Sequence, residues 1–426
     1  MNKKVYTFVA ILATTFAGIV PAMGQYASSV TDTIYMGASY SNEIYYSMPS
    51  GDKGTVNRSQ WDIAFRANRM SASILTNDGA NVGLYSYPKS DTSGWATVDT
   101  SGLSNWTVMV NSTTDWEDGA FCRNQKGHPD YGWGKYNSVS HNVVGDSLFI
   151  IKLRDGSFRK LWIMEKFSSA NVFEFRFANI DGTNDTTVMV DCSPYATKNF
   201  IGYSISTRKV VDFEPVVSAQ WDLLITKYMY TYPDGTLYPV TGVLSNYTTK
   251  VKKFKPVAPD FLMSVPQTMD STRSPIGWDW KSFNMSTFAY EVGDSLAYFV
   301  QNSNGVIYKL VFKEFVGSST GRIVLEKEQI SLTGVRESEK SGFNAAVYPN
   351  PVNDVLNLVI NPGKTRLAQV TLLDMSGRTV LNKRYELAPE ELSTLKIPVS
   401  GLRSGVYMIR IQSGTNIIAR KIIVNN

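Results

Sequence analysis

Apolar and polar residues alternate in short runs along most of the chain, with the period of two that is typical of β-strands. Residues 59–65, Ser-Gln-Trp-Asp-Ile-Ala-Phe, are followed after a turn-rich stretch by the apolar run 144–153. The second half of the chain contains a similar succession, because residues 219–225 are followed by 292–300. A pattern that recurs in this way predicts two related β-rich modules.

The alternation also indicates which side chains form the core. On each strand of the first copy, every second residue is apolar and should face inward; these residues are Trp61, Ile63, Phe65, Phe149, Ile151 and Leu153. Aromatic residues make up 12% of the chain and supply much of the buried surface. Each module is therefore long enough to bury a core of its own.

Each copy also contains the signal for a hairpin. Asp155-Gly156 and Asn304-Gly305 each separate an apolar run from a second apolar run. Asp-Gly and Asn-Gly favour a two-residue type I′ turn, in which both central residues have positive φ. The sequence therefore predicts an antiparallel hairpin in each module.

The last part of the chain has a similar pattern on a smaller scale. Short apolar or β-branched runs are separated by the turn signals Asn361-Pro362-Gly363, Ser376-Gly377 and Ser413-Gly414. Such spacing favours a small β-sandwich. We therefore expect an all-β chain with two tandem antiparallel modules followed by a C-terminal β-sandwich; the predicted ranges are 25–192, 193–333, a linker at 334–342, and 343–426.

The first residues have the pattern of a secretory signal peptide. Two lysines, Lys3 and Lys4, precede an uncharged apolar stretch at 5–20, and small residues before Gln25 offer a cleavage site. The prediction is a signal peptide at 1–24. No other run approaches the roughly 20 apolar residues that a membrane-spanning helix needs.

The net charge of +5 comes from the two ends of the chain. Residues 1–24 and 343–426 together hold 12 of the 42 basic and five of the 37 acidic residues, so 30 basic and 32 acidic residues remain between them. This balance gives no reason to expect nucleic-acid binding. Cys122 and Cys192 could form one disulfide, but two cysteines cannot make a disulfide scaffold or a cysteine-based zinc site, and no metal site is predicted.

Three motifs in the tail identify its relatives. In chain order they are Tyr348-Pro349-Asn350-Pro351, then Asp374 and Gly377 in Leu-Asp-Met-Ser-Gly-Arg, then Gly405 and Tyr407 in Leu-Arg-Ser-Gly-Val-Tyr. The segment 343–426 resembles the type A C-terminal sorting domain of the Bacteroidota type IX secretion system. The resemblance implies export across the outer membrane to the cell surface or beyond, with the type IX machinery and its C-terminal signal processing as partners.

The repeated part resembles a second family. The Trp-Asp-aliphatic strand, the turn at Asn77-Asp78-Gly79 and the aliphatic hairpin are similar to the HmuY-like haem-binding proteins, more clearly in the first copy than in the second. The resemblance implies an all-β module that holds haem between two axial side chains. It also implies haem, or host haemoproteins, as a cofactor or partner.

The candidate haem ligands are His128 and His141, the two histidines of the chain. Both follow the leading strand of the first copy, and two neutral imidazoles can ligate haem iron. Four aromatic rings in this segment could stack on the porphyrin, foremost Tyr131 and Trp133, and also Trp116 and Tyr136. The alternative is that both histidines are ordinary polar loop residues. Since the second copy has no histidine, it is better interpreted as a structural or protein-binding repeat.

Two further functions are weighed against haem capture. Gly-Asp-Ser-Leu occurs at 145–148 and 293–296, but the esterases with this motif also need an Asp-x-x-His, which the chain lacks. We therefore expect a protein that is not an enzyme. Tryptophans at 95, 106 and 133 leave open a non-enzymatic adhesion protein that binds a glycan or another protein.

Overall fold

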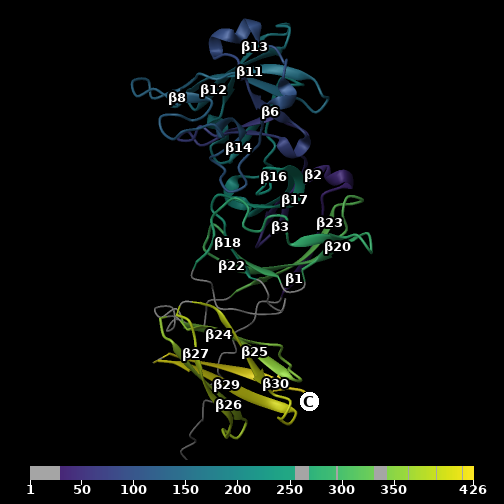
Figure 1. Ribbon diagram of the computed structural model, residues 1–426, viewed down its shortest axis with the longest axis vertical. Helices are drawn as coiled ribbons and strands as arrows, with labels where there is room; N and C mark the ends of the chain where they lie inside the picture. Colours follow the sequence, from purple (N-terminus) through teal and green to yellow (C-terminus); the bar gives the residue numbers. More distant parts are fainter. Residues whose placement is uncertain are drawn as a thin grey trace, which may run out of the picture.

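The computed structural model describes residues 29–254, 268–293, 296–330, 343–362, 364–389, 391–414 and 416–426. The predicted all-β fold is confirmed, since the sheets are all antiparallel (Figure 1). The predicted signal peptide and the linker at 334–342 lie outside the described residues.

The first module consists of two facing sheets. Its larger sheet contains, in spatial order, β13 (Thr186–Asp191), β12 (Val172–Asn179), β11 (Phe158–Phe167), β10 (Phe149–Lys152), β6 (Gly83–Ser86) and β7 (Val108–Met109), with β9 (Val143–Gly145) and β8 (Gly134–Tyr136) at the side. Its smaller sheet contains β15 (Lys209–Val211), β14 (Phe200–Ser204), β4 (Ile63–Arg66) and β5 (Ile74–Thr76).

The second module repeats this arrangement. One sheet contains β1 (Val30–Tyr35), β23 (Arg322–Gln329), β22 (Ile307–Phe315), β21 (Ala297–Gln301) and β18 (Lys250–Phe254). The other contains β17 (Leu237–Ser245), β16 (Leu223–Thr231), β2 (Asn42–Ser47) and β3 (Gly51–Asn57). A separate hairpin is formed by β19 (Lys281–Asn284) and β20 (Ala289–Val292).

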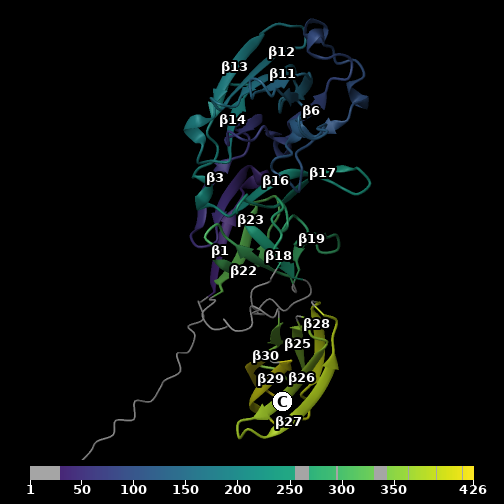
Figure 2. The ribbon, with the colours of Figure 1, turned by 90° about the vertical axis from the view of Figure 1, so that its left-hand side faces the viewer.

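The strand pairing divides the chain differently from the predicted boundary at 192/193. β1 pairs with β23, and β2 pairs with β16, so the N-terminal strands complete the second module. Figure 2 shows these strands, in purple, beside the green strands of the second half. Ile34, Ile44 and Tyr46 lie in the second module's core. The first module is thus inserted between β3 and β16.

A buried hydrogen-bond network occurs in both modules and supports the predicted repeat. The carboxylate of Asp62 accepts a 2.8 Å hydrogen bond from the backbone N–H of Ile205. The carboxylate of Asp222 accepts the equivalent 2.7 Å bond from Met48. In each module an asparagine side chain also donates to the backbone oxygen of the tryptophan before the aspartate, Asn77 to Trp61 and Asn246 to Trp221. The aspartate therefore ties the leading strand to its neighbour in both modules.

Both predicted hairpins form, but their turns are not of type I′. β10 pairs with β11, and β21 pairs with β22. Gly156 and Gly305 have φ of 85° and 79°, whereas Asp155 and Asn304 are not among the residues with positive φ. In both turns the glycine N–H donates a hydrogen bond to the backbone oxygen of the residue three positions earlier, as in a type I turn followed by a left-handed glycine.

The two smaller sheets face each other between the modules. Their contact forms a core of its own, to which Trp61, Trp221 and Leu244 contribute. Strands β4, β5, β14 and β2 are consequently buried on both sides. Ile63 and Phe65 face the first module's core as predicted, but Trp61 belongs to this junction instead.

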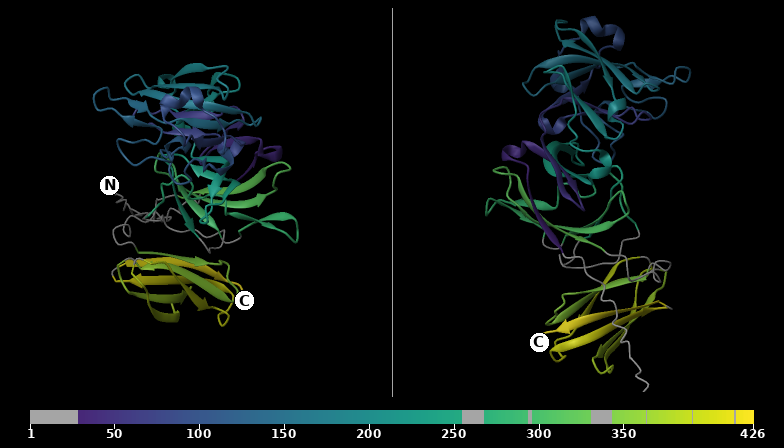
Figure 3. Two further views of the ribbon diagram at one scale, coloured as in Figure 1. Left: turned by 45° about the horizontal axis from the view of Figure 1, so that its top comes forward. Right: turned by 180° about the vertical axis from the view of Figure 1, so that it is seen from behind.

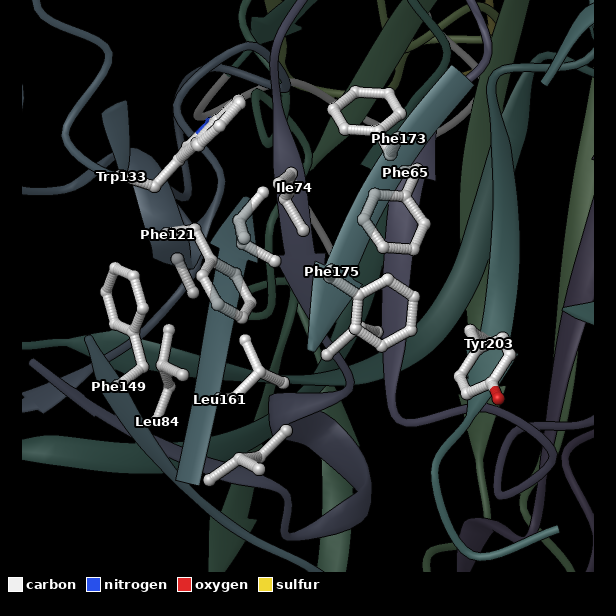
Figure 4. Close-up of a cluster of buried hydrophobic side chains, with 14 of the residues drawn as sticks. Phe65, Ile74, Leu84, Phe121, Trp133, Phe149, Leu161, Phe173, Phe175 and Tyr203 are labelled. Carbon is white, nitrogen blue, oxygen red and sulfur yellow. The ribbon is translucent and has the colours of Figure 1, made fainter. Parts of the chain in front are cut away.

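The first module's own core is rich in aromatic rings. Phe65 lies 4.8 Å from Phe173 and 5.4 Å from Phe175, measured between ring centroids (Figure 4). Cys122 and Cys192 are buried in the same cluster as free thiols. The possible disulfide is therefore not formed in this structure.

The C-terminal domain is a β-sandwich, as predicted. One sheet contains β24 (Phe343–Tyr348), β25 (Val355–Pro362) and β28 (Ser393–Pro398); the other contains β27 (Thr379–Glu386), β26 (Leu367–Asp374), β29 (Gly405–Ser413) and β30 (Asn416–Val424). Figure 3 shows this domain, in yellow, at the end of the molecule next to the second module. Val359 packs there against a cluster that contains Phe254 and Phe299.

Candidate functional site

The second tail motif forms the turn between β26 and β27. The carboxylate of Asp374 accepts hydrogen bonds from the backbone N–H of Ser376 at 2.9 Å and of Arg378 at 3.0 Å. The bond from the Ser376 hydroxyl does most to lower the pKa of Asp374, to about 2. Gly377 has φ of 81°, a conformation that favours glycine. The motif residues are thus those that this turn needs.

The first and third tail motifs fasten the ends of the sandwich. Asn350 accepts a 2.7 Å hydrogen bond from the backbone N–H of Ile423 and donates one of 3.1 Å to the backbone oxygen of Lys421, so it ties the first motif to β30. The hydroxyl of Tyr407 donates a 2.8 Å bond to the backbone oxygen of Arg403. Each motif therefore has a structural role within the sandwich.

The two histidines meet around a tyrosine at the surface of the first module. The hydroxyl of Tyr136, the last residue of β8, lies 2.7 Å from Nδ1 of His141. The ring of His128 lies 5.2 Å from that of Tyr136 and 6.4 Å from that of Tyr131. Both histidines are exposed. The structure thus brings together His128, His141, Tyr131 and Tyr136, and Tyr136 is the contact that the two histidines share.

Trp133 does not belong to this surface group. Its side chain is fully buried, its indole N–H donates a 3.0 Å hydrogen bond to the backbone oxygen of Ala72, and its ring lies 6.4 Å from that of Phe173 (Figure 4). A buried ring with its one donor occupied cannot stack on a ligand at the surface. Trp133 is therefore a core residue, in contrast to its predicted role.

A second surface group was not predicted. Tyr230, Tyr232, Tyr238 and Trp278, here called the aromatic patch, gather where β16 turns into β17. Tyr232 lies 5.2 Å from Tyr230, 5.9 Å from Trp278 and 6.5 Å from Tyr238. This hairpin projects from the body (Figure 2). The alternation of tyrosines at 228, 230 and 232 is the sequence signal that could have indicated it.

The Gly-Asp-Ser-Leu motif of the first copy is a turn in the structure. The hydroxyl of Ser147 donates a 2.9 Å hydrogen bond to the adjacent carboxylate of Asp146. In the second copy Asp294 and Ser295 lie outside the described residues. Across the parts of the chain that the structure describes, no helix is long and apolar enough to cross a membrane.

Comparisons with known proteins identify the tail. Residues 346–425 match the family model described as a secretion system C-terminal sorting domain. The chain is also similar, at 12% identity and a TM-score of 0.16, to PorZ, a surface component of the type-IX secretion system of Porphyromonas gingivalis. That alignment covers 68% of this chain and 44% of PorZ, so the chain spans less than half of that protein's length. No curated protein matches the chain. Residues 346–425 are therefore a type IX secretion C-terminal sorting domain, which marks the chain as a secreted protein delivered to the cell surface or the extracellular space.

Proposed function

We propose that the chain is a non-enzymatic adhesion protein of the cell surface and that it binds partner proteins through the aromatic patch. The observation that carries this proposal is the gathering of three tyrosines of the β16–β17 hairpin, which projects from the body (Figure 2), with Trp278 from the segment before β19. Tyrosine and tryptophan offer a large contact area with few rotatable bonds, and they dominate the binding energy of many protein interfaces.

The patch is held in place before any partner binds. β16 and β17 pair over nine residues each, from Leu223 with Ser245 to Thr231 with Leu237. At the base of the hairpin, Tyr228 and Val240 are buried in the core between the modules. A preformed surface loses little conformational entropy on binding, which favours affinity.

The patch combines apolar and polar surface. Tyr238 is 56% exposed, and Trp278 is half-buried. Beside Trp278, the carboxylate of Asp279 forms a 2.7 Å ion pair with Lys253. An aromatic centre with a charged rim is the usual composition of a protein interface.

The test is binding of the purified chain to immobilised fibronectin, collagen and fibrinogen, measured by surface plasmon resonance. Tyr232→Ser combined with Tyr238→Ser should weaken binding about tenfold or more, because two central anchors are removed. Phe288→Ser is the matched control, since Phe288 is 76% exposed on another hairpin. Equal binding by wild type and the patch variant would contradict the proposal. If only periodate oxidation of the immobilised proteins abolished binding, the ligand would be a glycan on those proteins instead.

A second candidate function is haem capture by the first module. The specific observation is the hydrogen bond between Tyr136 and His141. A tyrosine oxygen can ligate ferric haem iron, and a histidine that accepts the phenol proton makes that oxygen a better ligand. His128 and Tyr131 would then lie beside the bound haem. In this arrangement His141 assists the ligand Tyr136, whereas the sequence suggested two axial histidines.

A haemin titration followed by absorbance tests this second function. The chain should give a saturable Soret band, and Tyr136→Phe and His141→Ala should each reduce haemin affinity. Tyr35→Phe, at an exposed tyrosine of β1, should bind haemin like the wild type. Unsaturable haemin uptake, or saturable uptake that is the same in all four proteins, would exclude the Tyr136 site.

A further inference from the structure

A cavity lies between the two modules, where the smaller sheets face each other. It has about 540 Å³ of empty space, part of which is open to solvent, and the centre of a water molecule can occupy about 50 Å³ of it. Aromatic side chains form much of its wall; they are Tyr45, Trp61, Trp116, Phe200, Phe213 and Trp221. The cavity thus has room for a few water molecules or one small organic molecule.

Six residues on the wall carry buried polar atoms that have no hydrogen-bond partner in the described parts of the chain. These atoms are Nε1 of Trp61, Nε1 of Trp221, Nε of Arg273, Oγ1 of Thr76, Oε1 of Glu43 and the hydroxyl oxygen of Tyr228. Each of these residues is less than 10% exposed. A buried polar group without a partner is destabilising, so six around one cavity favour a polar molecule as its occupant.

The ionisable groups around the cavity are arranged so that it carries little net charge. Burial raises the pKa of Glu43 to about 7 and that of Glu214 to about 8, so both carboxyls are largely protonated in mildly acidic solution. The positive charge of Arg273 is opposed by Asp78, whose charge raises the pKa of Arg273, and burial lowers the pKa of Lys227, a second cation on this wall. A neutral ligand therefore suits the cavity better than an ion.

The donors and acceptors on the wall are mixed. Two indole N–H groups and one guanidinium N–H can donate, while the two hydroxyls can donate or accept. The rings of Trp61 and Phe213 stack with centroids 4.8 Å apart, and Arg273 lies 4.0 Å from the ring centre of Trp116. Flat aromatic walls with mixed hydrogen-bonding groups match a molecule that has apolar ring faces and hydroxyl edges.

We propose that this cavity binds one small neutral polyhydroxyl molecule of the monosaccharide class. Such a ligand would offer hydrogen-bond partners to the six unpartnered polar groups and pack against the aromatic wall. The proposal is independent of adhesion through the aromatic patch, because none of the four patch residues lines the cavity. It assigns a ligand site to the contact between the modules.

Isothermal titration of the full chain with glucose, galactose, mannose and N-acetylglucosamine tests the proposal. At least one sugar should bind with a stoichiometry of one per chain. Thr76→Val removes one unpartnered polar atom and keeps the side-chain shape, and Trp221→Phe removes another together with part of the aromatic wall, so each should weaken binding of that sugar about threefold to tenfold. Thr76→Val should leave the unfolding midpoint equal or higher, because it removes a buried hydroxyl without a partner.

The control variant is Trp278→Phe, which alters the aromatic patch and should bind the sugar like the wild type. Sodium acetate serves as the anionic probe and should not compete with the sugar. Absence of binding by all four sugars, unchanged affinity in both cavity variants, or tighter binding of acetate would each overturn the proposal. Loss of adhesion in the Tyr232 and Tyr238 variant with retained sugar binding would separate the two sites.

Discussion

At the scale of single residues, the buried aspartates of the two modules support much of the fold. Asp62 is fully buried, and besides its bond from Ile205 it forms a 2.8 Å ion pair with Arg154. Asp62→Ala would leave the buried N–H of Ile205 without an acceptor. We expect a loss of about 2 to 3 kcal/mol in the free energy of unfolding of the first module, measured by urea denaturation.

The exposed Asp99, which pairs with Lys89 at the surface, provides the control for this experiment. Asp99→Asn should hardly move the urea midpoint, since exposed ion pairs contribute little. An Asp62→Ala protein as stable as Asp99→Asn would show that the aspartate network does not hold the strands together.

Glu214 makes stability depend on pH. Burial raises its folded-state pKa to about 8, although its oxygens accept hydrogen bonds from the backbone N–H groups of Asn199 and Phe200. The unfolded chain releases this proton near pH 4.5. Between these pH values the folded state holds a proton that the unfolded state has released, so the free energy of unfolding decreases as the pH rises. The stabilisation that this proton provides is complete below about pH 4.5 and is lost as the pH rises towards 8.

Glu214→Gln cannot titrate and should therefore flatten the decrease in stability over this range. The difference in slope between the two proteins can reach about 1.4 kcal/mol per pH unit, the limit for one proton. Urea unfolding at several pH values measures this difference in slope. Glu43, whose pKa is also raised, is present in both proteins and therefore affects both pH profiles alike. Parallel pH profiles for wild type and variant would refute the raised pKa.

At the scale of elements, the hairpin turns depend on one backbone conformation. Gly156 has φ of 85°, and no atom lies within 4 Å of the place where a Cβ would be. Gly156→Ala should therefore cost roughly 1 to 2 kcal/mol through backbone strain alone. Gly156→Asn should cost less, because asparagine tolerates this conformation better. Thermal unfolding distinguishes the two variants, and equal midpoints would contradict the account.

The sequence was sufficient to predict these hairpins but not the partners of every strand. A period of two shows that a segment can be a strand and which residues share a face. It carries no information on the strand's neighbours, so the pairing of β1 with β23 across the whole body was not foreseen. Trp61 was assigned to the wrong core because it lies two residues before β4, so the alternation of Ile63 and Phe65 does not extend to it.

At the scale of the whole molecule, the N-terminal strands should be essential to the second module. Deletion of residues 29–57 would remove the neighbours of β23 and β16 together with buried side chains such as Ile44 and Tyr46. We expect amides of β16 and β23 to lose protection in hydrogen exchange, while those of β11 and β12 keep most of theirs. A chain without 343–426 is the control and should keep protection in both modules.

The candidate sites could be predicted only in part, for a physical reason. His128 and His141 were identifiable because histidine is rare here, and the structure places both beside Tyr136. The sequence does not distinguish Trp133 from the other aromatic residues near it, and only the folded chain shows that Trp133 is buried. The cavity between the modules combines residues from β2, β5, β14, β16 and β17, and no local pattern could bring these together.

The most direct test of the whole account is the adhesion of cells that produce this chain. The cells are applied to a surface coated with whichever of fibronectin, collagen and fibrinogen the purified chain binds most tightly. The account predicts adhesion by cells with the wild-type chain and by cells with Phe288→Ser. It predicts no adhesion by cells whose chain lacks 343–426, because that variant is not delivered. It predicts much weaker adhesion by cells whose chain carries Tyr232→Ser with Tyr238→Ser, because two anchors of the aromatic patch are removed. Wild-type adhesion in either of these last two strains would contradict it.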